Sequence, residues 1–327
     1  MKKILKVAVV NLLILAILVL IFELALRSFW KMSALKEEIY RASSNKILRY
    51  ELRPNIKTVY ACREVSINSH GFRGKECSIR KDPGTYRIVM IGDSVAFGKL
   101  LPFEDTLGER LACSLTAACP GKKFEVLNMG VEGYNSIQEL ELLKVKGLKF
   151  DPDLVIVYYC FNDPDYPEYY FKKNFINRHS QLARYILYKA RKHMIKKEKK
   201  REGIKNIEDN FRYLYSTDCW QHAKEAIMEM GDLTAARGIK MILLTVPEMS
   251  EPVKDFKQGY PFWYINDLLG GIKHGNILVI DPMKEFARQG LKKEMLTVWA
   301  YPNRRANEII AEYAVSKLQE NKIKFCN

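Results

Sequence analysis

The sequence lacks the motifs of several large functional classes. No Gly-x-Gly-x-x-Gly or Gly-x-x-x-x-Gly-Lys-Ser/Thr run follows an apolar segment, which argues against a dinucleotide or nucleoside triphosphate site. The seven cysteines form no Cys-x-x-Cys pair and no Cys/His spacing typical of a metal centre. No zinc-finger, helix-turn-helix or aromatic RNA-binding motif is present. We therefore expect no cofactor, no metal and no nucleic-acid partner.

Acidic residues are scarce relative to basic ones. The 327 residues include 53 Lys and Arg against 38 Asp and Glu, a net charge of +15. Much of the excess lies between residues 184 and 205, in a helix expected from about Ser180 to Arg201. A nucleic-acid-binding protein would distribute its charge differently. The helix is either a solvated surface element or one that faces a membrane or closes over a site.

Long apolar runs are confined to the N-terminus. Three lysines precede a nearly unbroken apolar run over residues 7–22, close to the roughly 20 residues that span a bilayer. A cleaved signal peptide is the alternative, but no Ala-x-Ala site follows, and Glu23, Arg27 and Trp30 are typical of an interfacial anchor. We predict a signal-anchor at residues 1–30 and a single-pass membrane protein whose bulk is extracytoplasmic.

The cysteines are compatible with an oxidising compartment, in which short-range disulfides form. Cys160 falls at the end of an expected buried strand and is the natural unpaired thiol. The predicted pairs are Cys62–Cys77, Cys113–Cys119 and Cys219–Cys326.

Short apolar, β-branched runs alternate with helix-like segments along the rest of the chain. This alternation predicts an α/β fold, a three-layer α/β/α sandwich around a five-stranded parallel sheet. The strands are expected at residues 87–91, 124–128, 153–160, 240–246 and 276–280. Helices are expected at about 106–115, 136–148, 180–201, 220–237 and 303–319.

Polar residues follow three of these strands at the same edge of the sheet, where open α/β sheets bind ligands. Gly92-Asp93-Ser94 follows the first strand, Asn128 leads into Gly130 and Gly133, and Asn162-Asp163 follows the third. Ser94 is a candidate nucleophile. The backbone N–H groups of Ser94 and Gly133 and the side-chain amide of Asn162 are candidates for an oxyanion hole.

These three segments resemble the first three sequence blocks of the SGNH/GDSL hydrolases. The resemblance covers roughly residues 66–318 and implies an SGNH/flavodoxin-like fold, with the domain at 81–327 and a basic, aromatic-rich insertion at about 164–217. Residues 31–80 are expected to be a stalk and an N-terminal extension, helix-prone to residue 50 and irregular afterwards.

The fourth block of the family, Asp-x-x-His-Pro-Asn, is altered in this chain. Val298 stands at the Asp position and Tyr301 at the His position, before an intact Pro302-Asn303. A tyrosine cannot replace histidine as a base near neutral pH, because its reference pKa is about 10. We expect Tyr301 to point into the cleft, where its phenol could hydrogen-bond Ser94.

The resemblance implies action on O-acyl esters of carbohydrate, cell-envelope material or lipid through Ser94, by hydrolysis or acyl transfer. The alternative is a pseudoenzyme that binds an acylated glycan or a protein partner. Among the five histidines, His70 is the best candidate for a relocated base, because its segment precedes the first strand.

Overall fold

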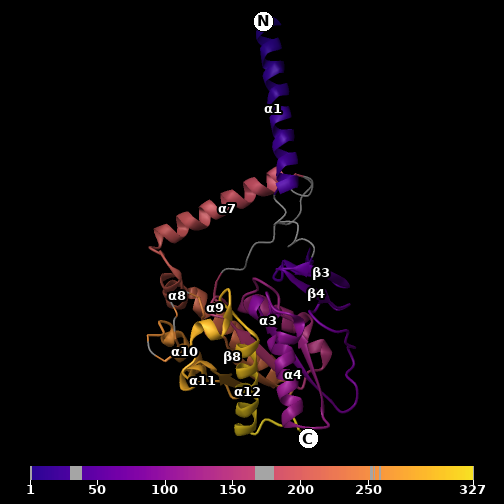
Figure 1. Ribbon diagram of the computed structural model, residues 1–327, viewed down its shortest axis with the longest axis vertical. Coiled ribbons are helices and arrows are strands. Elements are labelled where there is room, and N and C mark those ends of the chain that lie inside the picture. Colours follow the sequence, from indigo (N-terminus) through magenta and orange to yellow (C-terminus); the bar gives the residue numbers. More distant parts are fainter. Residues whose placement is uncertain are drawn as a thin grey trace.

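Helix α1 (Lys2–Phe29) extends away from the folded domain in the computed structural model, and the C-terminus lies at the opposite end of the molecule (Figure 1). The structure describes residues 2–29, 39–165, 180–250, 253, 255–257 and 259–326. By length and composition, residues Lys2–Arg27 are apolar enough to cross a membrane.

The centre of the domain is a five-stranded parallel sheet in the order β6-β5-β7-β8-β9. The sequence prediction of this sheet is confirmed. Its middle strands are apolar because helices cover both faces, and every residue of β5 and β7 is buried. The strands are β5 (Thr85–Gly92), β6 (Lys123–Asn128), β7 (Leu154–Tyr159), β8 (Lys240–Thr245) and β9 (Ile277–Ile280).

Helices form the two outer layers. Helix α4 (Leu107–Ala118) connects β5 to β6, its neighbour on one side. Helix α5 (Ser136–Val145) connects β6 to β7, which lies on the other side of β5. Right-handed crossovers then place these helices on opposite faces. Helix α12 (Arg304–Glu320) packs against α4, and α9 (Asp218–Ala235) packs against α5. The predicted three-layer sandwich is therefore confirmed.

Further described elements lie outside these layers or between them. They are α3 (Ser94–Phe97), η1 (Phe103–Asp105), η2 (Gly147–Phe150), α7 (Gln181–Arg201), α8 (Ile207–Ser216), α10 (Trp263–Gly270), α11 (Met283–Arg288), η3 (Lys293–Met295), β10 (Thr297–Val298) and β11 (Tyr301–Pro302). The predicted aromatic cluster at Tyr166, Tyr169, Tyr170 and Phe171 lies outside the described residues.

The region before the domain differs from its prediction. The described part of 31–50 is not a helical stalk, and 51–80 is not irregular, because two antiparallel hairpins occupy this stretch. Their strands are β1 (Tyr40–Ala42), β2 (Tyr50–Leu52), β3 (Ile56–Tyr60) and β4 (Arg63–Ile67). Tyr40, Leu48 and Leu52 are buried in the same core as the sheet. Burial of alternate strand residues, rather than helix propensity, decides this region.

The disulfide predictions were wrong. The structure pairs Cys119 with Cys326, whose α-carbons are 5.4 Å apart, and leaves Cys62, Cys77, Cys113 and Cys219 as free thiols. Closeness in sequence misled the prediction. Cys113 lies within α4 and is exposed, and six residues of helix turn it well away from Cys119 at the end of α4. Cys160 is a buried free thiol, as expected.

Candidate active site

Ser94 begins a short helix directly after β5. Asp93 caps this helix, its Oδ1 accepting a hydrogen bond of 2.8 Å from the amide of Val95. Gly92 is required because a Cβ there would lie 2.6 Å from the Cβ of Ala96 and 2.7 Å from the carbonyl oxygen of Tyr158. The absence of a side chain at Gly92 thus lets the chain turn sharply and present Ser94 at the carboxyl edge of the sheet.

Asn128 and Gly130, from the second sequence block, hold the loop after β6 against α3. The side chain of Asn128 donates to the carbonyl of Ala96 (2.7 Å) and accepts from the amide of Gly130 (3.0 Å). A Cβ on Gly130 would lie 2.3 Å from the amide nitrogen of Phe97, so only glycine fits. Gly133 lies further along this loop with a φ of +80°.

The Ser94 hydroxyl has two hydrogen-bond partners. The phenol of Tyr301 donates to Ser94 Oγ over 3.3 Å, and Ser94 Oγ donates to Asp93 Oδ2 over 3.3 Å. Ser94 is only 9% exposed and lines a hollow of about 560 Å³. The expected orientation of Tyr301 into this cleft is therefore present in the structure.

Tyr301 lies in a small hairpin, β10–β11, in which Val298 and Tyr301 are directly opposite each other. Trp299 and Ala300 form its turn, and both have positive φ, as the tight hairpin turn demands. Asn303 then caps α12 by accepting from the amide of Ala306 (3.0 Å). Asn303, the Asn of the fourth block, thus has a structural role as a helix cap, although the residues at the acid and base positions differ from the family pattern.

Asn162 contacts the candidate site through a hydrogen bond to Asp93. Its side-chain amide donates to Asp93 Oδ2 over 3.2 Å, and the thiol of Cys160 donates to Asp93 Oδ1 over 3.1 Å. Asp93 is therefore bonded on both oxygens, which agrees with a role in shaping the turn. The assignment of Gly133 and Asn162 to an oxyanion hole stays a prediction.

Three buried side chains, those of Asp93, Cys160 and Asp163, lie close enough together for a metal ion. Burial, followed by the charge of Asp93, raises the pKa of the Cys160 thiol well above its usual value. A protonated thiol that donates to Asp93 is a hydrogen-bond partner and a poor metal ligand. The residues present do not favour a cation here.

Beneath this cluster lies a fully buried carboxyl group, Glu139. Burial, followed by the charge of Asp93, raises the pKa of Glu139 well above its usual value. Burial and the nearby Glu139 likewise raise the pKa of Asp163. Burial thus favours the protonated form of both carboxyl groups.

The hairpins of the N-terminal region support the loop that carries Gly133. The phenols of Tyr40 (3.5 Å) and Tyr60 donate to the carboxylate of Glu132, and Lys99 pairs with its other oxygen at 2.6 Å. The phenol of Tyr50 donates to the backbone carbonyl of Glu132 over 2.7 Å. Three tyrosines from β1, β2 and β3 thus hold the residue next to Gly133.

Arg73 holds the far end of α3 and was missed from the sequence. Its guanidinium donates to the carbonyls of Phe97 (2.8 Å), Gly98 (2.6 Å) and Leu101 (2.7 Å). Burial lowers the pKa of Arg73 to about 10. Residues 67–73 form a turn bridged from Ile67 to Arg73, and through Arg73 this turn also fixes the helix that begins at Ser94.

His70 is not a relocated base. Its Nε2 lies 2.9 Å from the carbonyl oxygen of Cys77, and its ring contacts Phe150. Phe150 precedes β7, so His70 lies at the amino edge of the sheet, opposite Ser94. Of the other described histidines, His274 bonds Asp232 (3.0 Å), while His193 and His222 are exposed. His179 lies outside the described residues.

Further polar groups line the hollow, and sequence reasoning did not identify them. Lys199 from the end of α7, Lys205 after it, and Glu248 after β8 all face this hollow with Ser94. They come from segments without a recognisable motif. The only available signal was the general one that loops at the carboxyl ends of strands carry ligand-binding residues.

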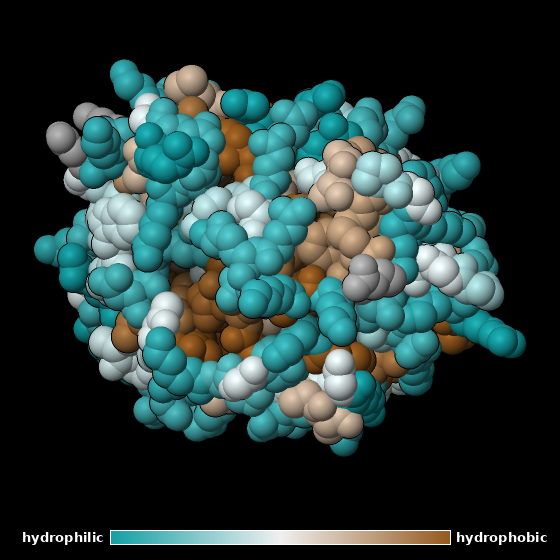
Figure 2. Space-filling view, turned by 90° about the horizontal axis from the view of Figure 1, so that it is seen from below, coloured by the Kyte–Doolittle hydropathy of each residue, from teal (hydrophilic) through white to brown (hydrophobic). Residues whose placement is uncertain are grey.

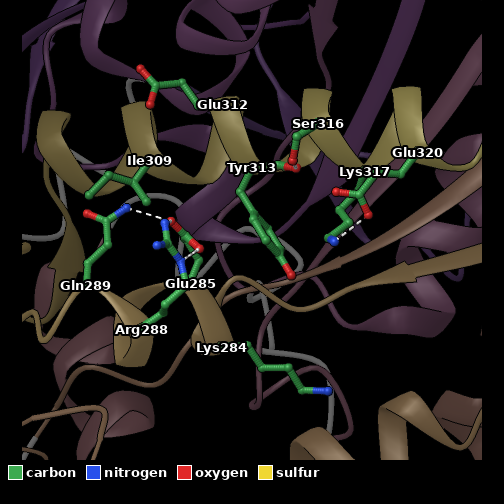
Figure 3. A pocket seen from close by; sticks show the side chains of 10 residues that line it. All are labelled: Lys284, Glu285, Arg288, Gln289, Ile309, Glu312, Tyr313, Ser316, Lys317 and Glu320. Atoms are coloured by element: carbon green, nitrogen blue, oxygen red, sulfur yellow. Dashed lines mark hydrogen bonds and ion pairs between the residues drawn. The ribbon is translucent and has the colours of Figure 1, made fainter.

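A second hollow, of about 480 Å³, lies between α11 and α12 (Figure 3). Four of its charged side chains pair with each other, Arg288 with Glu285 and Lys317 with Glu320 (Figure 3). These paired groups offer little to a ligand, and we regard the Ser94 cleft as the candidate active site.

Comparisons with known proteins give a likeness in structure alone. No model of a known protein family matches the chain, and no curated protein matches it. Among solved structures, a lipolytic protein of the G-D-S-L family from Desulfitobacterium hafniense is 17% identical, with 70% of this chain and 98% of that chain covered and a TM-score of 0.40. An acetylxylan esterase from Geobacillus stearothermophilus, solved as a catalytic mutant, is 14% identical, with 71% and 94% covered and a TM-score of 0.45. A two-domain esterase active on acetylated mannans is 13% identical, with 73% and 50% covered and a TM-score of 0.46.

The chain has a three-layer α/β/α fold, and its sequence blocks resemble those of the SGNH/GDSL hydrolases. Three sequence blocks stand at the carboxyl ends of β5, β6 and β7, in a five-stranded parallel sheet with Ser94 at its edge. Identities this low say nothing about activity, so the chemistry at Ser94 is argued from its own contacts.

Proposed function

We propose that this protein is a membrane-anchored SGNH-type domain that takes O-acyl esters at Ser94 and turns them over slowly. The substrate class would be acylated carbohydrate, cell-envelope material or lipid. The observation that carries the proposal is the hydrogen bond of 3.3 Å between Tyr301 and Ser94. The nucleophile is in position, and a phenol occupies the place of its base.

The chemistry would proceed through an acyl-serine. Ser94 Oγ attacks the ester carbon and loses its proton, and the alcohol leaves with a proton. Water, or a second alcohol, then takes the acyl group and restores the serine. The amides of Ser94 and Gly133 and the side chain of Asn162 would stabilise the oxyanion, a contribution that survives without a base.

The weak step is removal of the proton from Ser94. Burial raises the pKa of Tyr301 to about 12, opposed by its hydrogen bond to Ser94. At neutral pH the phenol is protonated and donates to the serine, the reverse of what a base does. Asp93 accepts from Ser94, but the amide of Val95, Cys160 and Asn162 already share its two oxygens.

A second candidate function is binding without turnover, favoured by the same contact. A cleft that keeps its oxyanion donors but not its base would hold an acylated glycan, or an acylated partner protein, without cleaving it. The proposals share a ligand class and differ in whether Ser94 ever becomes acylated.

Membrane anchorage and an extracytoplasmic position belong to the proposal. Their support is the apolar length of α1 and the disulfide Cys119–Cys326, because disulfides persist in oxidising compartments.

Labelling with a fluorophosphonate, followed by intact-protein mass measurement, separates the two candidates. A slow hydrolase gains one phosphonyl group at Ser94 over hours, and Ser94→Ala gains none. A binding protein gains none in either form, yet binds the acylated form of a short glycan more tightly than its deacylated form. Labelling within seconds would show that Ser94 has an effective base and would refute slow turnover.

A further inference from the structure

Helix α7 combines strong positive charge with exposed apolar side chains. Its 21 residues include nine Lys and Arg and a single Glu. Four apolar side chains on the same helix are nevertheless open to solvent: Ile186 (55%), Leu187 (39%), Met194 (63%) and Ile195 (40%). Basic helices at membrane surfaces combine positive charge with exposed apolar side chains in this way.

The first turn of α7 is attached to the end of α1. The carboxylate of Glu23 accepts hydrogen bonds from Ser180 Oγ (3.0 Å) and from the amide of Leu182 (2.8 Å). The rings of Phe22 and Tyr185 meet edge to face, with centroids 6.3 Å apart. Since Glu23 follows the apolar run of α1, these contacts fix the start of α7 at the level where α1 would leave a bilayer.

From that point α7 runs sideways, away from the axis of α1, and the domain lies beyond it (Figure 1). At 1.5 Å per residue, its 21 residues reach about 30 Å. The face of the molecule turned away from α1 carries mostly hydrophilic residues, which surround an apolar hollow (Figure 2). The basic, apolar helix is thus on the side of the molecule where α1 emerges.

The other end of α7 reaches the candidate active site. Lys199, in its last turn, lines the hollow above Ser94, together with Ile204 and Lys205 just beyond the helix. Helix α7 therefore connects the foot of α1 directly to the mouth of the cleft.

We propose that α7 lies on the membrane surface and binds the headgroups of anionic phospholipids, and that it thereby holds the Ser94 cleft toward the bilayer. The inference rests on the proposal that α1 spans the membrane. The occupant is argued from charge and continuity. A helix with one acidic residue is complementary to an anionic surface, and its start is fixed beside a membrane span. Apolar side chains such as Met194 enter the headgroup layer while the lysines contact phosphates.

Hydrogen exchange of the full-length chain in lipid nanodiscs tests this inference. One set of nanodiscs contains phosphatidylcholine alone, and the other contains phosphatidylcholine with phosphatidylglycerol at about 7:3. We expect peptides covering residues 181–201 to exchange more slowly in the anionic nanodiscs, and added salt to reverse the difference.

A triple variant identifies the lysines responsible. Lys196→Gln, Lys197→Gln and Lys200→Gln should weaken surface binding by about fivefold each, or about 100-fold together. The anionic lipid would then no longer slow exchange. The matched control changes three exposed lysines elsewhere, Lys273→Gln, Lys322→Gln and Lys324→Gln, and should behave as the wild type.

Three outcomes would overturn the inference. Exchange of α7 could be equal in both lipids, or the control could lose as much protection as the α7 variant. Protection that grows with protein concentration in phosphatidylcholine alone would assign α7 to a second copy of the chain. Alkaline extraction of the chain from vesicles separates the two failures. Chain that is extracted refutes the span itself, whereas retained chain without α7 protection refutes only the surface helix.

Discussion

Replacement of Arg73 by Gln should be among the most destabilising single changes near the site. Arg73 is 3% exposed and donates three hydrogen bonds to backbone carbonyls around the end of α3. Its guanidinium also lies over the ring of Phe97, 4.9 Å from the centroid. A shorter amide can reach at most one of the three carbonyls.

The expected cost follows from the acceptors left behind. An unpaired buried carbonyl costs roughly 1–3 kcal/mol, and two of them remain. The loss of the stacking contact adds about 0.5–1 kcal/mol. Release of a desolvated cation to water offsets part of this sum. We therefore expect Arg73→Gln to lower the free energy of unfolding by about 3–4 kcal/mol.

Guanidinium unfolding followed by circular dichroism measures this change. Arg63→Gln is the matched control, because Arg63 also donates to a carbonyl of the same loop, that of Leu100 at 2.9 Å, but is exposed. Its change should cost less than about 1 kcal/mol. If the two variants differ by less than about 1 kcal/mol, Arg73 does not hold α3 as argued.

Three other changes test the remaining physical claims. The pKa of Glu139 is raised above its ordinary value of 4.5. The stability that Glu139 contributes is therefore complete below pH 4.5 and is lost as the pH rises through the raised pKa. Urea unfolding of wild type and Glu139→Gln between about pH 5 and 7 should therefore show the variant gaining up to about 1.4 kcal/mol per pH unit, and parallel curves would contradict the buried proton. Ala300 has a positive φ of 67°, so Ala300→Val should cost more than about 1 kcal/mol in thermal unfolding while Ala300→Gly costs nothing, and equal losses would refute strain in the turn. Cys119→Ser and Cys326→Ser should each cost about 2–5 kcal/mol under non-reducing conditions, and the double change no more than one of them, since the bond spans 207 residues.

Much of the fold could be predicted because its signals are local. The run from Arg87 to Ile91 is apolar and β-branched, and it ends at Gly92, so both its burial and its end can be read directly. The placement of Ser94 follows from the rule that ligands bind at the carboxyl edge of parallel strands. The contact of Tyr301 with Ser94 followed from the spacing of the fourth block, which the turn before α12 preserves.

The contacts missed are those between distant segments. The pairing of Cys119 with Cys326 depends on where the last residues of the chain pack, which no local pattern encodes. The support of Glu132 by Tyr40 and Tyr60 joins residues more than 70 positions apart. Arg73 precedes the first strand of the sheet, but its three acceptors belong to a loop that only the folded chain brings near.

Turnover of p-nitrophenyl acetate by the wild type, Ser94→Ala and the double variant Val298→Asp with Tyr301→His tests the central claim most directly. The paired positions of Val298 and Tyr301 across the hairpin place an aspartate at 298 beside a histidine at 301. We expect the wild type to exceed Ser94→Ala only slightly, and the double variant to exceed the wild type by about 10²-fold, the low end of what a general base contributes. The gain should appear as the pH rises through about 6.5, where a histidine loses its proton. Rapid wild-type turnover that disappears in Ser94→Ala would contradict the claim that Ser94 is in place without a base.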